Sequence, residues 1–263
     1  MNEMIAVIYG LIQGLTEFLP VSSSGHLALL PHFLDFKDPG VFFDLAMHLG
    51  TALSITLYFY RDILALLKQV LDFIKNPKEV TKSAHSLNMI IATITTVFFI
   101  FLLKGFSEQF GREPKIMAIN LALFGIIMLV ADKAFKDIET GQMQLLQKKK
   151  SFLIGMFQAM AVFPGVSRSG ATLTISRVLG LGREEASRFS FLLSLPIIFA
   201  GFIYKLPKAM GENLDISSCL LGIAISFLTG LVTIHFFLKF IKKMGLFAFG
   251  IYRIILGSVL FFN

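Results

Sequence analysis

The chain has 263 residues, of which 55% are hydrophobic and 16% are charged, and its mean hydropathy is +0.75. A soluble domain rarely carries so little charge, so the composition excludes an ordinary water-soluble protein. The formal net charge of +7 does not indicate nucleic-acid binding, because the basic residues fall in loops between apolar runs, where the positive-inside rule explains them. The single Cys219 excludes an internal disulfide and a thiolate metal cluster.

The first element, residues 4–34, is an apolar stretch that breaks at a bend of Pro, Ser and Gly between Pro20 and Gly25 and then resumes. Each arm is about half as long as a membrane span. Non-helical backbone at membrane depth is tolerated only where protein or water covers it. We therefore expect a re-entrant helical hairpin, which dips into the membrane and returns to its own side.

The next runs, 41–60, 87–103 and 115–131, are long enough to cross the hydrocarbon core, which takes about 17–25 residues of helix. Between the first two of these runs, residues 61–75 form an amphipathic segment that suits the inner membrane surface.

A second interrupted region, residues 152–181, repeats the plan of the first around a bend from Pro164 to Gly170. Residues 10–25 and 155–170 align without a gap at an offset of 145 and share seven of sixteen positions. The identical pairs are Gly10/Gly155, Gln13/Gln158, Phe18/Phe163, Val21/Val166, Ser22/Ser167, Ser24/Ser169 and Gly25/Gly170. In membrane proteins, interruptions at corresponding positions of two halves point to a buried polar site.

Three more apolar runs, 188–204, 216–238 and 246–262, complete the chain. The predicted fold class is an all-α integral membrane protein, a polytopic helical bundle with six full spans and two re-entrant hairpins in one membrane domain, 1–263. Each half holds one hairpin and three spans. Because each half crosses the membrane three times, an odd number, the second half enters from the opposite side. The halves 1–131 and 152–263 are therefore predicted to be inverted-topology repeats whose hairpin tips meet near the midplane.

Loop charges orient this topology. Fourteen Lys and Arg residues fall on one side of the membrane and five on the other, so the side with fourteen is expected to be cytoplasmic. Both termini and the first hairpin then face outward.

The first hairpin carries several groups suited to chemistry. Gln13 and Glu17 are one helical turn apart, and an ionisable group inside an apolar segment is a functional hypothesis by default. The bend and the residues after it add hydroxyls, an imidazole and consecutive backbone N–H groups: Ser22, Ser23, Ser24, Gly25 and His26. Such a bend at a helix N-terminus forms an anion-binding nest. The alternative is a polar plug between helices with no chemical role.

The second hairpin places Arg168 in its bend, with Thr172 one turn later. Arginine is well suited to bidentate contact with phosphate. The neighbouring candidates for phosphate binding are Gly165, Ser167, Ser169 and Gly170. The alternative reading pairs Arg168 with Glu17 as a structural ion pair only.

Two further candidates, Asp44 and His48, share one face of a span. They suit metal binding, a proton relay or simple pairing with each other. Arg253, in the last span, is expected to neutralise a carboxylate such as Asp44 or to extend toward the membrane surface.

Together the hairpins suit a phosphate ester or anhydride in the membrane plane. Phosphoryl transfer needs positioning, charge neutralisation and an activated nucleophile. Arg168 and backbone amides would neutralise charge, a serine or water would attack, and His26 or Glu17 would act as base. Gln13 and Glu17 are hard-oxygen ligands that suit Mg²⁺ or Ca²⁺.

At these residues the chain resembles a known family, the bacterial undecaprenyl-diphosphate phosphatases of the BacA type, linked to bacitracin resistance. The family motif (E/Q)xxxE reads here Gln13-Gly14-Leu15-Thr16-Glu17, followed by a Pro-Val-Ser-Ser-x-Gly-His run from Pro20 to His26. The second motif, PGxSRSxxT, reads Pro164 to Thr172. The resemblance spans nearly the whole chain.

The resemblance implies hydrolysis of a C55 polyprenyl diphosphate lipid to the monophosphate and phosphate, which recycles the lipid carrier of peptidoglycan precursors. It also implies a multi-pass protein of the bacterial cytoplasmic (inner) membrane, dependence on a divalent cation and an active site open to the outer, periplasmic face. The family's candidate residues fall on Gln13, Glu17, Ser23, His26, Arg168, Ser169 and Thr172. Ser23 activated by His26 is one implied mechanism, and attack by water stays open. Gln13 in place of Glu removes one metal-binding charge.

A different class also fits, because inverted repeats with broken helices are typical of secondary transporters. A polyprenyl-phosphate flippase or anion transporter would need the anion cradle but not the base and nucleophile. The sequence leaves open which metal is used, whether a homodimer forms, which prenyl length is preferred and whether the lipid is also flipped.

Overall fold

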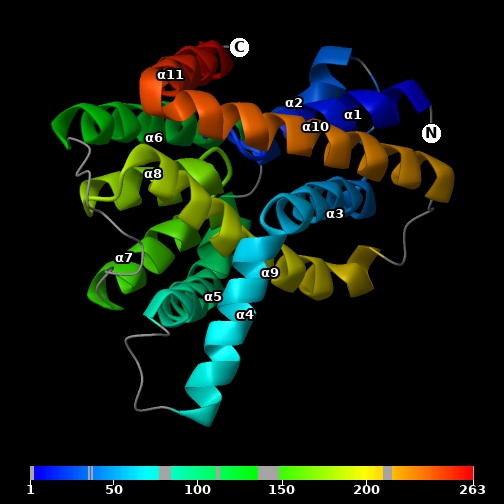
Figure 1. Ribbon diagram of the computed structural model, residues 1–263. Helices are drawn as coiled ribbons and strands as arrows, with labels where there is room; N and C mark the ends of the chain where they lie inside the picture. Colours follow the sequence, from blue (N-terminus) through cyan, green and yellow to red (C-terminus); the bar gives the residue numbers. More distant parts are fainter. Residues whose placement is uncertain are drawn as a thin grey trace.

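The computed structural model describes residues 3–34, 36, 38–76, 84–110, 113–135, 148–209 and 215–262, and within these ranges the secondary structure is helical, with no strands (Figure 1). The helices are α1 (Glu3–Thr16), α2 (Ser23–Leu34), α3 (Val41–Tyr58), α4 (Tyr60–Lys75), α5 (Ala84–Phe110), α6 (Pro114–Ala134), α7 (Lys148–Ala159), η3 (Met160–Val162), α8 (Arg168–Val178), α9 (Arg183–Ala209), α10 (Ile216–Met244) and α11 (Phe247–Phe262).

Within the described residues, five helices are long and apolar enough to cross a membrane: α3, α5, α6, α9 and α10. They correspond to five of the six predicted spans, although α3 ends at Tyr58, two residues before the predicted end of the first span. The sixth predicted span, 246–262, forms the 16-residue apolar helix α11, which is slightly shorter than the 17–25 residues that a full crossing usually takes. α11 lies beside α6 at the top of Figure 1.

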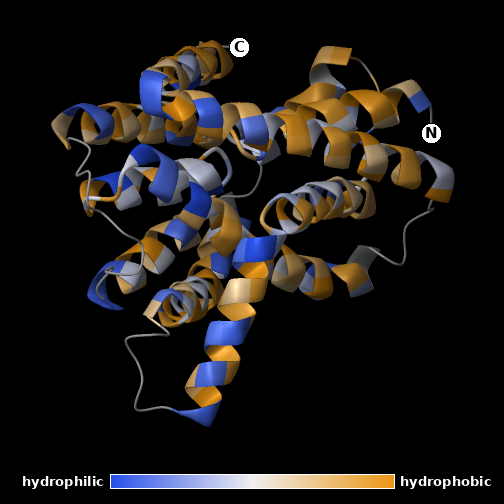
Figure 2. Cartoon of the chain, in the orientation of Figure 1, coloured by the Kyte–Doolittle hydropathy of each residue, from blue (hydrophilic) through white to orange (hydrophobic). Residues whose placement is uncertain are grey.

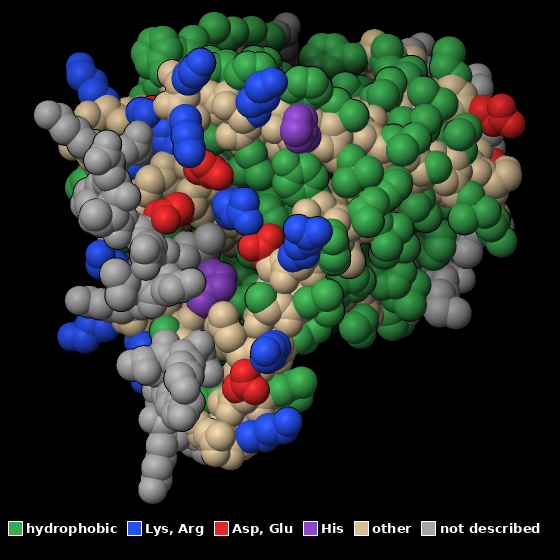
Figure 3. All heavy atoms as spheres, viewed as in Figure 1, with side chains coloured by type: hydrophobic (Ala, Val, Ile, Leu, Met, Phe, Trp, Pro, Cys, Tyr) green, Lys and Arg blue, Asp and Glu red, His purple; other side chains and the backbone are tan. Residues whose placement is uncertain are grey.

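Large apolar side chains cover the outside of the bundle, as expected for a surface solvated by lipid. Phe101 is 68% exposed and Ile203 is 70% exposed. Apolar residues dominate the outer faces of the helices in Figure 2. In Figure 3 the right-hand part of the molecule is almost entirely hydrophobic, whereas the Lys and Arg side chains gather toward the left and below. The protein is therefore an integral membrane protein, and on the face seen in Figure 3 its described basic residues gather toward one part.

α4 has no buried residue, and it extends away from the rest of the bundle in Figure 1. Its apolar side chains recur at helical spacing and are exposed: Leu64, Leu67, Leu71 and Ile74. The amphipathic pattern predicted for residues 61–75 is therefore present as a helix with an uncovered apolar stripe.

Both interrupted regions form two short helices joined by a bend. α1 ends at Thr16 and α2 begins at Ser23, whereas α7 and η3 end at Val162 and α8 begins at Arg168. The residue before each second helix, Ser22 or Ser167, has a positive φ, 76° and 69° respectively. Such a conformation is uncommon outside glycine and costs about 1–3 kcal/mol.

The repeated glycines let each hairpin pack closely on a long helix. A Cβ added at Gly10 would lie 2.8 Å from the Gly222 carbonyl oxygen of α10. A Cβ added at Gly155 would lie 2.8 Å from Cβ of Thr95 on α5. Such contacts are too short for any larger residue, so glycine is needed at the same place in both copies.

Candidate active site

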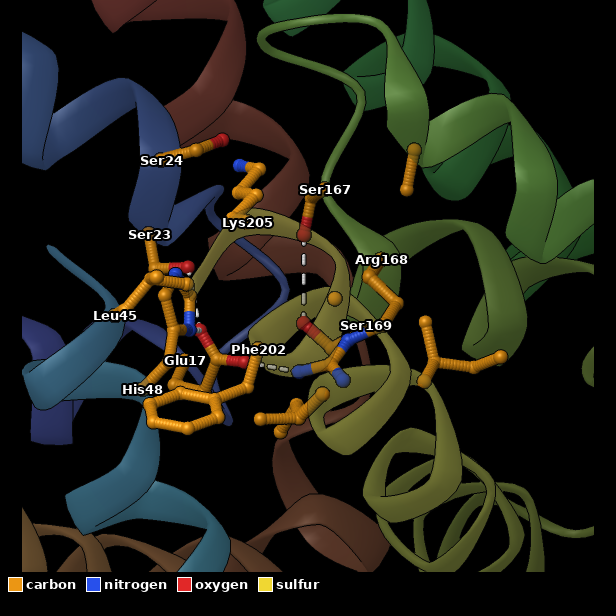
Figure 4. A pocket seen from close by; sticks show the side chains of 14 residues that line it. Glu17, Ser23, Ser24, Leu45, His48, Ser167, Arg168, Ser169, Phe202 and Lys205 are labelled. Atoms are coloured by element: carbon orange, nitrogen blue, oxygen red, sulfur yellow. Dashed lines mark hydrogen bonds and ion pairs between the residues drawn. The ribbon is translucent and has the colours of Figure 1, made fainter. Parts of the chain in front are cut away.

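The two bends meet at a cavity of about 260 Å³ (Figure 4). Its polar lining comes mainly from the bends and from α3: Glu17, Ser23, Ser24, His48, Ser167, Arg168 and Ser169. Its other wall comes largely from α9, whose contribution is Ile197, Ile198, Gly201, Phe202 and Lys205, with Leu45 and Ala161 completing the lining. One side of the cavity is therefore charged and hydroxyl-rich, and the other is apolar apart from Lys205.

Glu17 lies at the base of this cavity with only 3% of its side chain exposed. Its Oε2 accepts hydrogen bonds from Gln13 Nε2 at 2.9 Å and from Ser23 Oγ at 2.6 Å. Its Oε1 is paired with the guanidinium of Arg168. A buried carboxylate is tolerated when it is paired and hydrogen-bonded in this way.

Ser23, the first residue of α2, is the hydroxyl in direct contact with this carboxylate. A nucleophile within hydrogen-bond reach of a base, which is itself held by a third group, is the usual arrangement for covalent catalysis. In such an arrangement Glu17 would be the base and Arg168 the third group. The arrangement can equally deprotonate a water molecule next to Ser23.

Arg168 crosses from the second hairpin to the first. One terminal nitrogen binds Glu17, and the other donates to the carbonyl oxygen of Ser194 at 3.1 Å. The neighbouring Ser169 Oγ donates to the carbonyl oxygen of Leu19 in the first bend at 3.1 Å. The predicted meeting of the two bends is thus formed by a side-chain ion pair and a hydrogen bond to backbone.

The bends themselves are held by local serine contacts. Ser167 Oγ caps α8 by accepting the Gly170 N–H at 3.1 Å, and it lies 3.3 Å from Ser169 Oγ. In the first hairpin, the hydroxyls of Ser22 and Ser24 lie 3.5 Å apart. Ser24, Ser167 and Ser169 line the cavity.

The remaining candidates for phosphate binding do not line the cavity, namely Ser22, Gly25, Gly165, Gly170 and Thr172. Thr172 is fully buried; its hydroxyl donates to the Arg168 carbonyl oxygen at 2.9 Å and is hydrogen-bonded to Ser190 of α9. It therefore fixes the first turn of α8 against α9.

The two histidines occupy different surroundings. His26 points toward α11, where its Nε2 lies 2.6 Å from the Tyr252 hydroxyl and the rings stack at 5.7 Å between centroids. Its Nδ1 lies 2.8 Å from the carbonyl oxygen of Ser22. His48 lines the cavity, with its Nδ1 2.9 Å from Gln13 Nε2 and 3.5 Å from Glu17 Oε2.

The imidazole beside Glu17 is thus His48 of α3, whereas His26 contacts backbone and Tyr252. Asp44 is half-buried one turn before His48 and does not line the cavity. The i, i+4 pattern in the sequence identified His48 as a secondary candidate but could not show that it faces the first hairpin.

Arg253 of α11 is completely buried, and the expectation that it pairs with a carboxylate or reaches the membrane surface is wrong. It donates to backbone carbonyl oxygens of both bends: Pro20 at 3.2 Å, and Gly165 and Val166 at 2.8 Å each. One guanidinium therefore holds the two bends at a fixed separation. The N–H donors of a guanidinium point in several directions in one plane, so they can bind several carbonyl oxygens at once.

Gln13 Oε1 is buried and has no hydrogen-bond partner among the described residues. Most buried amide oxygens accept a hydrogen bond, so this free acceptor beside a carboxylate suits a hydrogen-bond donor or a cation. Within the described residues, no group of three or more His, Cys, Asp and Glu side chains is arranged to hold a metal ion. A cation at Gln13 and Glu17 would need further oxygen ligands from water or substrate.

Comparison with known proteins agrees with this site. A family model described as bacitracin resistance protein BacA matches residues 6–259. The chain belongs to this family. Among curated proteins, undecaprenyl-diphosphatase 1 of Pseudoalteromonas translucida (strain TAC 125) is 39% identical over 259 residues, which cover 98% of this chain and 97% of that protein. The BacA resemblance inferred from the two bend motifs is confirmed.

Proposed function

We propose that this protein hydrolyses undecaprenyl diphosphate to undecaprenyl phosphate and inorganic phosphate. This reaction regenerates the lipid carrier of peptidoglycan precursors and counters bacitracin. Family membership supports the substrate. The structural observation that carries the chemistry is the 2.6 Å contact between Ser23 Oγ and Glu17 Oε2, in a cavity shared with Arg168.

In the proposed mechanism, the terminal phosphorus is attacked in line with the bridging oxygen. Glu17 accepts the proton of the attacking hydroxyl, which belongs to Ser23 or to a water molecule beside it. The bond from phosphorus to the bridging oxygen breaks, and undecaprenyl phosphate leaves with that bonding pair. If Ser23 attacks, a phosphoserine forms and Glu17 passes its proton to the leaving undecaprenyl phosphate. Water then attacks the phosphoserine, Glu17 accepts the proton of this water, and inorganic phosphate is released as the Ser23 oxygen regains a proton.

Arg168 and the backbone amides of the bends offset the negative charge of the phosphoryl group. Arg168 is already oriented by Glu17 and Ser194, so little reorganisation is needed as the reaction proceeds. The half-apolar lining of the cavity suits a lipid phosphate, since Ile197, Ile198 and Phe202 lie opposite the bends.

A divalent cation, Mg²⁺ or Ca²⁺, fits this proposal. Gln13 and Glu17 would hold it, with oxygen atoms of the substrate and water completing its shell. When bound, it would offset phosphate charge next to the site of attack. The orphaned Gln13 Oε1 supports this assignment.

The proposed topology has two inverted repeats, residues 1–131 and 152–263, each with one re-entrant hairpin. The matching positive φ of Ser22 and Ser167 and the matching close packing of Gly10 and Gly155 support this arrangement. The excess of basic residues on one side supports a cytoplasmic-membrane protein whose cavity opens to the outer face.

The test is phosphate release from C55 diphosphate by the purified full chain in detergent, with Mg²⁺ or Ca²⁺ and then with EDTA. We expect release that EDTA abolishes and that added cation restores. Release unaffected by EDTA would remove the metal from the proposal. No release by folded protein with the cation present would contradict the hydrolase assignment, and lipid-phosphate translocation would then be measured.

A further inference from the structure

Three charged side chains line the active-site cavity: Glu17, Arg168 and Lys205. Glu17 and Arg168 form an ion pair and cancel each other's charge. The net charge of the lining is therefore that of Lys205, a residue near the C-terminal end of α9.

Arg168 is already engaged by protein groups before any ligand binds. Its two terminal nitrogens bind Glu17 and the carbonyl oxygen of Ser194, and only 17% of its side chain is exposed. Lys205 is exposed, and no hydrogen bond or ion pair joins it to another residue in the described ranges. Its ammonium group is therefore available to a ligand.

Lys205 belongs to the face of α9 that forms the apolar wall. Ile198, Phe202 and Lys205 are spaced by four and three residues, so they share one side of the helix, and all three line the cavity. Figure 4 shows the Lys205 side chain between Ser24 and Ser167, which come from opposite bends. This part of the cavity lining thus combines one ammonium group with two hydroxyls.

We infer that Lys205, with Ser24 and Ser167, forms a second phosphate subsite that holds the lipid-linked phosphate while the terminal phosphate occupies the Ser23–Glu17–Arg168 side. This inference rests on the proposed function, because it assigns the second phosphate of the same substrate. Ammonium groups bind phosphate as point charges, and hydroxyls add donors. The subsite would make the protein prefer prenyl diphosphates over prenyl monophosphates.

The test measures binding rather than turnover, so that it stands apart from the test of hydrolysis. The probes are a C15 prenyl methylenediphosphonate, which cannot be hydrolysed at its bridging carbon, and a C15 prenyl phosphonate. Their Kd values are measured by calorimetry with wild type, Lys205→Met and Lys205→Arg in detergent. Lys104→Met is the matched control, because Lys104 contacts the adjacent Tyr204 at 3.5 Å and does not line the cavity.

We expect Lys205→Met to raise the Kd of the diphosphonate about tenfold, the effect of roughly 1.4 kcal/mol, and to change that of the monophosphonate less than about threefold. Lys205→Arg should restore most of the difference, and Lys104→Met should leave both values unchanged. An unchanged diphosphonate Kd in Lys205→Met would overturn the subsite. Equal weakening of both probes, or the same effect from Lys104→Met, would also overturn it, because the lysine would then act only through general surface charge.

Discussion

Ser22 and Ser167 lie 145 residues apart, yet each is the last residue of a bend, directly precedes a helix and has a positive φ, 76° and 69° respectively. Two serines in a conformation that favours glycine mark strain at the same place in both hairpins. Such strain is often found where backbone N–H groups must be turned toward a ligand. The strain here coincides with the predicted anion-binding bends.

This strain predicts an inverted order of stability for two substitutions that both remove a hydroxyl. Ala usually stabilises a protein relative to Gly by about 0.4–1 kcal/mol, because Gly has more freedom in the unfolded chain. At Ser22 the order should reverse, with Ser22→Gly more stable than Ser22→Ala by about 1 kcal/mol, since Gly adopts positive φ without a Cβ clash. Thermal unfolding midpoints in detergent would measure the difference; a more stable Ala variant would show that the backbone is not strained there.

The contacts of Arg253 predict that replacing it lowers both the stability and the activity of the protein. Arg253→Met would leave the carbonyl oxygens of Pro20, Gly165 and Val166 buried without this donor, at a cost of about 1–3 kcal/mol for each one not otherwise satisfied. We expect a clearly lower unfolding midpoint and little phosphate release, with partial recovery of both in Arg253→Lys.

The control for this prediction is Arg188→Met. Arg188 pairs with Asp62 at 2.9 Å in a half-exposed position, so its loss should cost less than about 1 kcal/mol. Equal midpoints for Arg253→Met and wild type would contradict the role of Arg253 in holding the bends.

The position of His48, the imidazole nearest to Glu17, predicts that its removal lowers the rate of hydrolysis. His48→Ala should lower kcat by about 10²-fold, the lower end of what general acid–base groups contribute, because His48 lies 3.5 Å from Glu17 and contacts Gln13. His235→Ala is a matched control, since His235 is exposed on α10 near Tyr58 and outside the cavity. Steady-state phosphate release would measure both, and a His48→Ala enzyme with normal kcat would remove His48 from the chemistry.

Much of the bend region could be predicted from the sequence, because both motifs combine apolar arms with Pro, Gly and Ser, and their ionisable residues are conspicuous in a membrane segment. Glu17 and Arg168 were identified this way, whereas Ser23 was singled out among the neighbouring serines by the family resemblance. The structure brings the three together. The different surroundings of His26 and His48 depend on packing: Tyr252, which stacks on His26, lies 226 residues away in sequence.

Nothing in the sequence indicated that residues of α9 would form one wall of the cavity. Ile197, Ile198 and Phe202 look like any other residues of an apolar span, because a lipid-facing side and a cavity-facing side have the same composition. Arg253 was misjudged for a related reason: its partners are backbone carbonyl oxygens, which leave no trace in the sequence of the residues that supply them.

The central claim is that Ser23 and Glu17 act as one unit in hydrolysis, and a double-mutant comparison tests it most directly. Phosphate release from C55 diphosphate would be measured for Ser23→Ala, Glu17→Gln and the double variant, with Ser258→Ala, an exposed serine on α11, as control. Each single variant should lose at least about 10²-fold in kcat, and the double variant should be no worse than the poorer single one, as for residues that work together. Near-normal turnover in either single variant, or losses that multiply in the double variant, would contradict the account.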